Sequence, residues 1–106
     1  NFITLIPVAN VFHNIYYIRI MNINELIKIV EKKIKNQIVL ESIRVEDKSF
    51  LHKDHKGNQK DKFHLKIIIN SKELENFTKI ENTKKIYKIL DNEIKHFIHS
   101  IQILIN

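Results

Sequence analysis

Residues 49–70 read SFLHKDHKGNQKDKFHLKIIIN and join a polar loop to the start of an apolar strand. Two of the six histidines, His52 and His55, lie in the loop, and a third, His64, is the second residue of the apolar run. Neutral imidazole is the commonest metal ligand near pH 7, so a loop with two histidines is a candidate donor site. We expect the rest of the chain to form a frame that holds this loop.

The loop is flanked by two segments in which apolar residues alternate with polar ones. In residues 42–47, Ile43 and Val45 alternate with charged side chains, which predicts a short strand with one buried side. The run FHLKIIIN at residues 63–70 has an apolar residue at every second position and ends at the turn signal of Asn70. The two strands are expected to pair as a hairpin with a long loop.

Two other segments repeat apolar residues at helical spacing, which predicts helices over residues 23–36 and 79–94. Their apolar stripes are Leu26, Ile27, Val30 and Ile34 in the first helix and Ile80, Thr83, Tyr87, Leu90 and Ile94 in the second. Both begin with capping-box signatures, Asn22 with Glu25 and Thr78 with Glu81.

The C-terminal segment alternates again, which predicts a third strand from Phe97 to the end. The alternation places His99 on the apolar side of that strand. The predicted order is helix, strand, strand, helix, strand, without an internal repeat. This order is typical of a single small α/β domain of the α+β kind with a three-stranded sheet.

Composition limits the function classes. The chain has 106 residues, enough for one domain, and a formal charge of +6, which favours nucleic acid, an anionic membrane or an acidic partner. A drift of composition toward Lys, Asn and Ile explains the charge equally well. The chain has no cysteine, which excludes disulfides and a thiol nucleophile. No apolar run reaches the ~18 residues that span a bilayer, so we expect a soluble protein.

The composition shifts at Met21, the only methionine. Residues 1–20 are apolar and aromatic and contain no acid, whereas residues 21–106 carry the predicted domain. A leader or disordered extension, a strand packed on the domain, and upstream sequence before a natural start at Met21 all stay open. Mitochondrial and cytoplasmic locations stay open for the same reason.

Four pieces of sequence, in order between Met21 and Ile105, resemble the BolA-like protein family. They are SIRVEDKS with the histidine loop after it, FHLKIII, LENFTKIENTKKIYKIL and IHSIQI. The resemblance implies a small fold related to class II KH domains, with two main helices on one face of a three-stranded sheet. The chain departs from the family at residues 82–84, where Asn-Thr-Lys replaces a common Arg-His-Arg stretch.

The same resemblance implies a function. BolA-like proteins pair with a monothiol glutaredoxin and its glutathione and share a [2Fe-2S] cluster, in iron–sulfur trafficking or iron regulation. By position in the matching pieces, His52 and His99 stand where the family places cluster ligands, and His64 matches a family histidine ahead of the apolar run. His55 lies three residues after His52 and is a candidate to replace it.

The absence of cysteine agrees with a shared cluster. A [2Fe-2S] cluster usually takes four thiolates, and imidazoles replace two of them in some centres. A chain with histidines and no thiol therefore completes a cluster only when a partner brings the sulfur. We expect no cluster on the chain alone, which should be a monomer.

Structural explanations for these histidines stand beside the functional one. His52 and His55, between lysines and aspartates, are by default solvated. His64 lies on the same side of its strand as Lys66, which favours a hydrogen-bonded sheet residue over a metal ligand. His99, on the apolar side of its strand, is ordinarily a structural histidine.

Nucleic-acid binding is the alternative function, as some bacterial BolA-like proteins are DNA-binding regulators. Lys79, Lys84, Lys85 and Lys88 are its candidate surface and would contact phosphate without reading sequence. A GXXG loop is absent, because Gly57 is the only glycine. No nucleophile, acid–base pair or phosphate-binding glycine loop indicates an enzyme.

Overall fold

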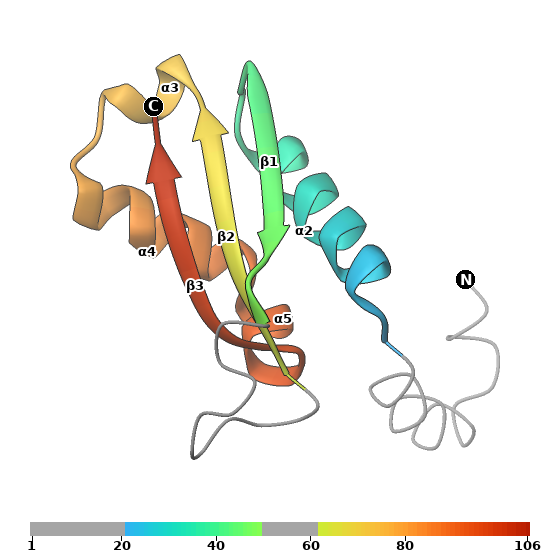
Figure 1. The fold of residues 1–106 in the computed structure, drawn as a ribbon. Helices are drawn as coiled ribbons and strands as arrows, with labels where there is room; N and C mark the ends of the chain where they lie inside the picture. Colours follow the sequence, from blue (N-terminus) through green and yellow to red (C-terminus); the bar gives the residue numbers. More distant parts are fainter. Residues whose placement is uncertain (1–20, 50–61) are drawn as a thin grey trace, which may run out of the picture.

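The computed structural model describes residues 21–49 and 62–106. Residues 1–20, for which a leader or extension, a packed strand and upstream sequence stay open, lie outside the described residues. In chain order the elements are α2 (Ile23–Gln37), β1 (Ser42–Asp47), β2 (Phe63–Asn70), α3 (Lys72–Glu75), α4 (Lys79–Ile89), α5 (Asp91–His96) and β3 (Ile98–Ile105). Figure 1 shows the three strands as one sheet with α2 and α4 behind it. The predicted mixed domain with a three-stranded sheet is confirmed.

The central strand is β2, in the sheet order β1-β2-β3. It pairs antiparallel with β1, with Val45 opposite Ile67, which confirms the predicted hairpin. It pairs parallel with β3, with Ile67 opposite Ile103. Because parallel neighbours cannot be joined by a tight turn, the chain crosses behind the sheet through α3, α4 and α5 before it returns as β3.

The core lies between the sheet and the helices, and α2, α3 and α4 all contribute buried side chains to it. Alternate side chains of β2 and one stripe of α2 are at most 2% exposed. They are Leu65, Ile67 and Ile69 from the strand and Leu26, Val30 and Ile34 from the helix. Burial of each such side chain contributes about 1.5–3 kcal/mol. Of the stripe predicted for the first helix, only Ile27 is merely half-buried.

The helix starts follow the predicted capping residues. The side chain of Asn22 accepts a hydrogen bond of 2.9 Å from the Glu25 N–H at the start of α2. Thr78 and Glu81 form a complete capping box ahead of α4. Side-chain oxygens at these positions satisfy amide groups that have no partner inside the helix.

The helix predicted over residues 79–94 is in fact two helices, α4 and α5, which meet at Leu90. The backbone of Leu90 has φ −99° and ψ 18°, away from helical values, and its side chain is fully buried. The prediction of one helix was wrong because no glycine or proline marks the turn. The helix axis changes direction at Leu90, where the side chain is buried and no helix-breaking residue is present.

The inward face of α4 also differs from the predicted stripe. Ile80 is 68% exposed and Tyr87 is 42% exposed, whereas Asn82 and Ile86 are buried. Two sets of residues at helical spacing overlap in this segment. The set that faces the core contains Asn82 and Ile86, and it was not predicted because it is the more polar of the two. Asn82 is tolerated there because its amide nitrogen donates to the Leu74 carbonyl oxygen at 2.8 Å.

In the described ranges, no helix combines the length and the apolar character needed to cross a membrane.

Candidate functional site

The pairing of β3 with β2 begins with an irregularity. Phe63 lies opposite Ile98 and His64 lies opposite Ser100, so His99 is an extra residue in a β-bulge. Ile98 is buried, whereas His99 is exposed. The expectation that His99 lies on the apolar side of the strand was wrong because the bulge interrupts the alternation. The bulge turns this imidazole toward solvent.

His64 lies beside His99 and is anchored in three ways. Its N–H donates to the Ser49 Oγ at 3.1 Å, and its carbonyl oxygen accepts from the Lys48 N–H at 2.7 Å. Its Nδ1 shares a hydrogen bond of 2.7 Å with the Ser100 Oγ. Only 5% of the residue is exposed. The hydrogen-bonded sheet role predicted for His64 is therefore confirmed.

The two imidazoles form an edge-to-face pair. The ring centroids of His64 and His99 are 4.9 Å apart and the ring planes are inclined by 62°. The buried, hydrogen-bonded ring of His64 thus packs against the exposed ring of His99. Within residues 21–49 and 62–106 no group of three or more His, Cys, Asp or Glu side chains is placed to hold a metal ion. This part of the chain offers an exposed imidazole on a rigid base and no complete site.

The histidine loop starts at this pair. His52 and His55 lie outside the described residues. In the sequence His52 is only three residues after Ser49, whose hydroxyl binds the backbone of His64. The last described residue before the loop, Ser49, therefore lies next to the histidine pair.

A charged cluster on β1 and the residue after it borders the pair. Glu46 lies opposite Lys66 and forms ion pairs with Arg44 at 3.0 Å and Lys48 at 3.3 Å. The hydrogen bond from Lys48 lowers the pKa of the Glu46 carboxyl, because it stabilises the charged form. Glu46 therefore stays an anion to lower pH than an isolated glutamate, and it holds the Lys48 side chain next to the start of the histidine loop.

The lysines predicted to bind nucleic acid lie on or beside α4. Lys79, Lys84 and Lys88 are exposed. Lys85 is half-buried, because its ammonium group binds the Glu73 carboxylate at 3.3 Å and lies 5.2 Å from the Phe77 ring centre. One of the four predicted cations is thus committed to an intramolecular contact.

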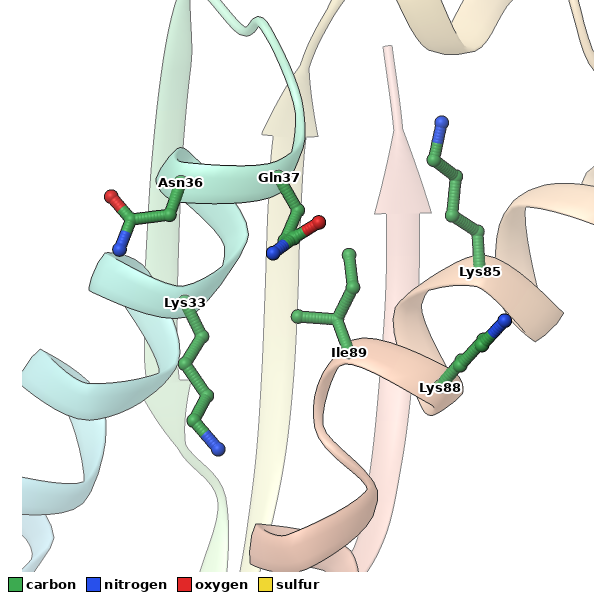
Figure 2. Close-up of a pocket in the computed structure, with 6 residues that line it drawn as sticks. All are labelled: Lys33, Asn36, Gln37, Lys85, Lys88 and Ile89. Atoms are coloured by element: carbon green, nitrogen blue, oxygen red, sulfur yellow. The ribbon is translucent and has the colours of Figure 1, made fainter.

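A groove of about 530 Å³ separates α2 from α4 and is shown in Figure 2. Its lining residues are Lys33, Asn36, Gln37, Lys85, Lys88 and Ile89. The ammonium groups of its three lysines point in different directions in Figure 2. Lys33 binds the buried Glu93 carboxylate at 2.8 Å. The groove is basic, but its cations do not converge on one point.

Two parts of this arrangement escaped prediction. Ser100, which binds the His64 ring, was not identified because its position opposite His64 depends on the parallel register and the bulge. The Lys33–Glu93 ion pair joins residues 60 positions apart. No local pattern in a single sequence carries either contact.

Comparisons with known proteins agree with this fold. The "DNA-binding transcriptional regulator BolA" of Haemophilus influenzae is 30% identical over 74 residues, 70% of this chain and 69% of that protein. The structure of BolA1 from Arabidopsis thaliana superposes with a TM-score of 0.64 at 23% identity, covering 76% of this chain and 88% of that one. The BolA domain of SufE1 from the same plant gives a TM-score of 0.65 at 21% identity, with 81% and 93% covered.

These two structures show the shared fold, and the regulator shows a relationship in sequence. The model of the family described as "BolA-like protein" matches residues 34–106. This range includes the histidine pair, the whole sheet and helices α3 to α5. The chain therefore belongs to the BolA-like protein family.

Proposed function

We propose that the protein is a non-enzymatic partner of a monothiol glutaredoxin and shares a [2Fe-2S] cluster with it, in iron–sulfur trafficking or iron regulation. His99 is the ligand that the observations favour most, because a bulge exposes its ring while the anchored His64 packs against it. His52, from the loop that starts beside this pair, is proposed as the second ligand. His55 is the alternative in the same loop.

The donor chemistry of the chain fits a shared cluster better than a resident one. The chain contains no cysteine, and its described residues include no group of three metal-binding side chains. One or two imidazoles complete a [2Fe-2S] cluster only together with sulfur from elsewhere. A glutaredoxin cysteine and its glutathione would supply that sulfur.

His64 and Ser100 have a different role in this proposal. The ring of His64 is buried and its Nδ1 is occupied by the hydroxyl of Ser100, so it is a positioning residue. A fixed ring beneath His99 limits the orientations that the exposed imidazole can adopt. Outer groups that orient a metal ligand commonly affect affinity as well.

The direct test is a titration of the full chain into a glutaredoxin that carries its cluster, followed by visible absorption and circular dichroism. The unmodified chain should change the cluster spectrum and saturate at one-to-one. His99→Ala and His52→Ala should each remove this change. His96→Ala should not, because His96 lies at the end of α5 and is not part of the His64–His99 pair. If His99→Ala still produced the full spectral change, the assignment of His99 as a ligand would be contradicted.

DNA binding is a second candidate function, favoured by the name of the Haemophilus relative and by the exposed Lys79, Lys84 and Lys88. Contacts of this kind neutralise phosphates and lose strength as salt rises. The triple variant Lys79→Gln, Lys84→Gln, Lys88→Gln should weaken duplex binding in a mobility-shift assay and flatten its salt dependence. The cluster titration should be unaffected. Equal DNA affinity of the variant would remove this candidate.

A further inference from the structure

Among the described residues, no strand pairs with the outer edge of β3, which lies next to a groove. In the sheet order β1-β2-β3, β3 is an edge strand. The Asn106 N–H donates to the Ile69 carbonyl oxygen of β2 at 2.8 Å. Because successive residues of a strand direct these groups to opposite edges, those of Ile103 and Ile105 face away from β2. This edge can accept another strand.

The segment from α3 to α4 forms the other wall of this groove, which encloses about 370 Å³. We call it the β3 groove and define it by Leu74, Phe77, Asn82, Ile103, Leu104 and Ile105. Phe77 is 44% exposed and Leu104 is 40% exposed. An extended chain laid along β3 would cover these two apolar side chains.

Among the described residues, the side-chain oxygen of Asn82, Oδ1, has no hydrogen-bond partner. Asn82 lines the groove, is only 4% exposed, and uses its amide nitrogen to bind the Leu74 carbonyl oxygen. A buried acceptor without a donor is unfavourable, so each such atom in a native protein requires an explanation. Because the oxygen itself has almost no accessible surface, an N–H or O–H donor of a ligand reaches it only when the wall of the groove moves.

We propose that the β3 groove binds an extended peptide segment of a partner protein, which adds to β3 as a fourth strand. Its backbone would pair with Ile103 and Ile105, and one apolar side chain would cover Phe77. A small movement of the groove wall on binding would let a donor reach the Oδ1 of Asn82. Main-chain pairing supplies affinity in this mode, and side-chain pockets supply selectivity.

The charges and walls of the groove favour a peptide over other occupants. Among the described residues, Lys79 and Glu75 are the only charged ones that line it, so this part of the chain does not supply the row of cations that a single-stranded nucleic acid requires. Residues of the α3–α4 segment wall the groove, so an occupant must fit between this wall and β3. A narrow peptide of low net charge meets both conditions.

The test selects peptides from a phage-displayed library of random 12-residue sequences on the immobilised full chain. Enriched peptides should contain alternating apolar residues. A synthetic copy should shift the amide resonances of Ile103 and Ile105 and the side-chain amide of Asn82. N-methylation of alternate residues removes donors from one peptide edge and should weaken binding at least about tenfold in one of the two frames.

Phe77→Ala should weaken the selected peptide about tenfold. Ile80→Ala is the matched control, because Ile80 is also exposed but does not line the groove. Asn82→Leu should weaken binding while the chain stays folded by circular dichroism; if it unfolds, Phe77→Ala carries the test. The proposal is overturned if no peptide enriches, if the shifts lie elsewhere, or if N-methylation in both frames has no effect. Occupation of the groove by oligo(dT) or by a second copy, detected by the same resonances, would equally overturn it.

Discussion

The surroundings of the two ends of β3 differ in the hydrogen bonding of their buried polar residue and in the polarity of their exposed residue. At the start of the strand, the buried polar residue His64 has hydrogen-bond partners for its backbone and its ring, and the exposed residue His99 is polar. Near the far end, the Oδ1 of the buried Asn82 has no hydrogen-bond partner among the described residues, and the exposed Phe77 is apolar. One bulge at His99 accounts for the first arrangement. The difference underlies the two proposals, a metal-donor role for His99 at one end and a docking surface at the other.

The largest expected contrast in stability is between the two histidines of the pair. His64→Ala should lower the free energy of unfolding by about 2 kcal/mol or more, because it removes a buried ring and its hydrogen bond. His99→Ala should change it by no more than about 0.5 kcal/mol, because the side chain is exposed. Urea denaturation followed by circular dichroism measures both. Equal losses would mean that His99 is structural as well.

The ion pair that holds α5, the helix leading into β3, should give the next largest effect. Lys33→Met leaves the carboxylate of Glu93, which is 3% exposed, without its cation and should cost about 1–3 kcal/mol. Lys95→Met is the matched control, because the Lys95–Asp91 pair is exposed and should contribute less than about 0.5 kcal/mol. Thermal unfolding of both variants checks the difference. Similar small losses would mean that water solvates Glu93.

Ser100 should have a smaller effect that separates orientation from ligation. Ser100→Ala removes the hydroxyl that binds His64 and should cost about 1 kcal/mol. It should weaken the cluster titration without abolishing it, because His99 remains. Ser100→Thr keeps the hydroxyl and should restore both values. If Ser100→Thr behaved like Ser100→Ala, the hydrogen bond would not be what matters at this position.

The smallest effect concerns pH. Glu46 has a lowered pKa in the folded chain, chiefly through its hydrogen bond with Lys48. Its contribution to stability is therefore fully present above the pKa of the unfolded chain and is lost as the pH falls through the lower folded pKa. Glu46→Gln should slightly reduce the loss of the free energy of unfolding at acid pH. The dependence of that free energy on pH near pH 7 should not change. A change in slope only at neutral pH would point to another group.

Much of the fold follows from the sequence because it depends on local patterns. Alternation at residues 63–70 predicted β2, and the capping residues Asn22 and Thr78 predicted the starts of α2 and α4. The break at Leu90 was missed because it depends on burial of that side chain and not on a local breaker. The inward face of α4 was missed because Asn82 is polar, and its burial depends on a hydrogen bond to α3.

The site was predictable in residue type and less so in arrangement. Position in the matching sequence pieces identified His99 and His64 as candidates, and the structure brings their rings into contact. The exposure of His99 was not predictable, because it depends on one extra residue in the pairing of two strands. Ser100 was missed for the same reason.

The most direct test of this account compares His64→Ala and His99→Ala in one experiment that records both unfolding in urea and the cluster titration with glutaredoxin. The account predicts that His99→Ala keeps its stability and loses the spectral change, whereas His64→Ala loses stability and, in the fraction that stays folded, retains part of the change. The opposite result, with His99→Ala unstable but still able to share the cluster, would contradict the assignment of His99 as the exposed ligand.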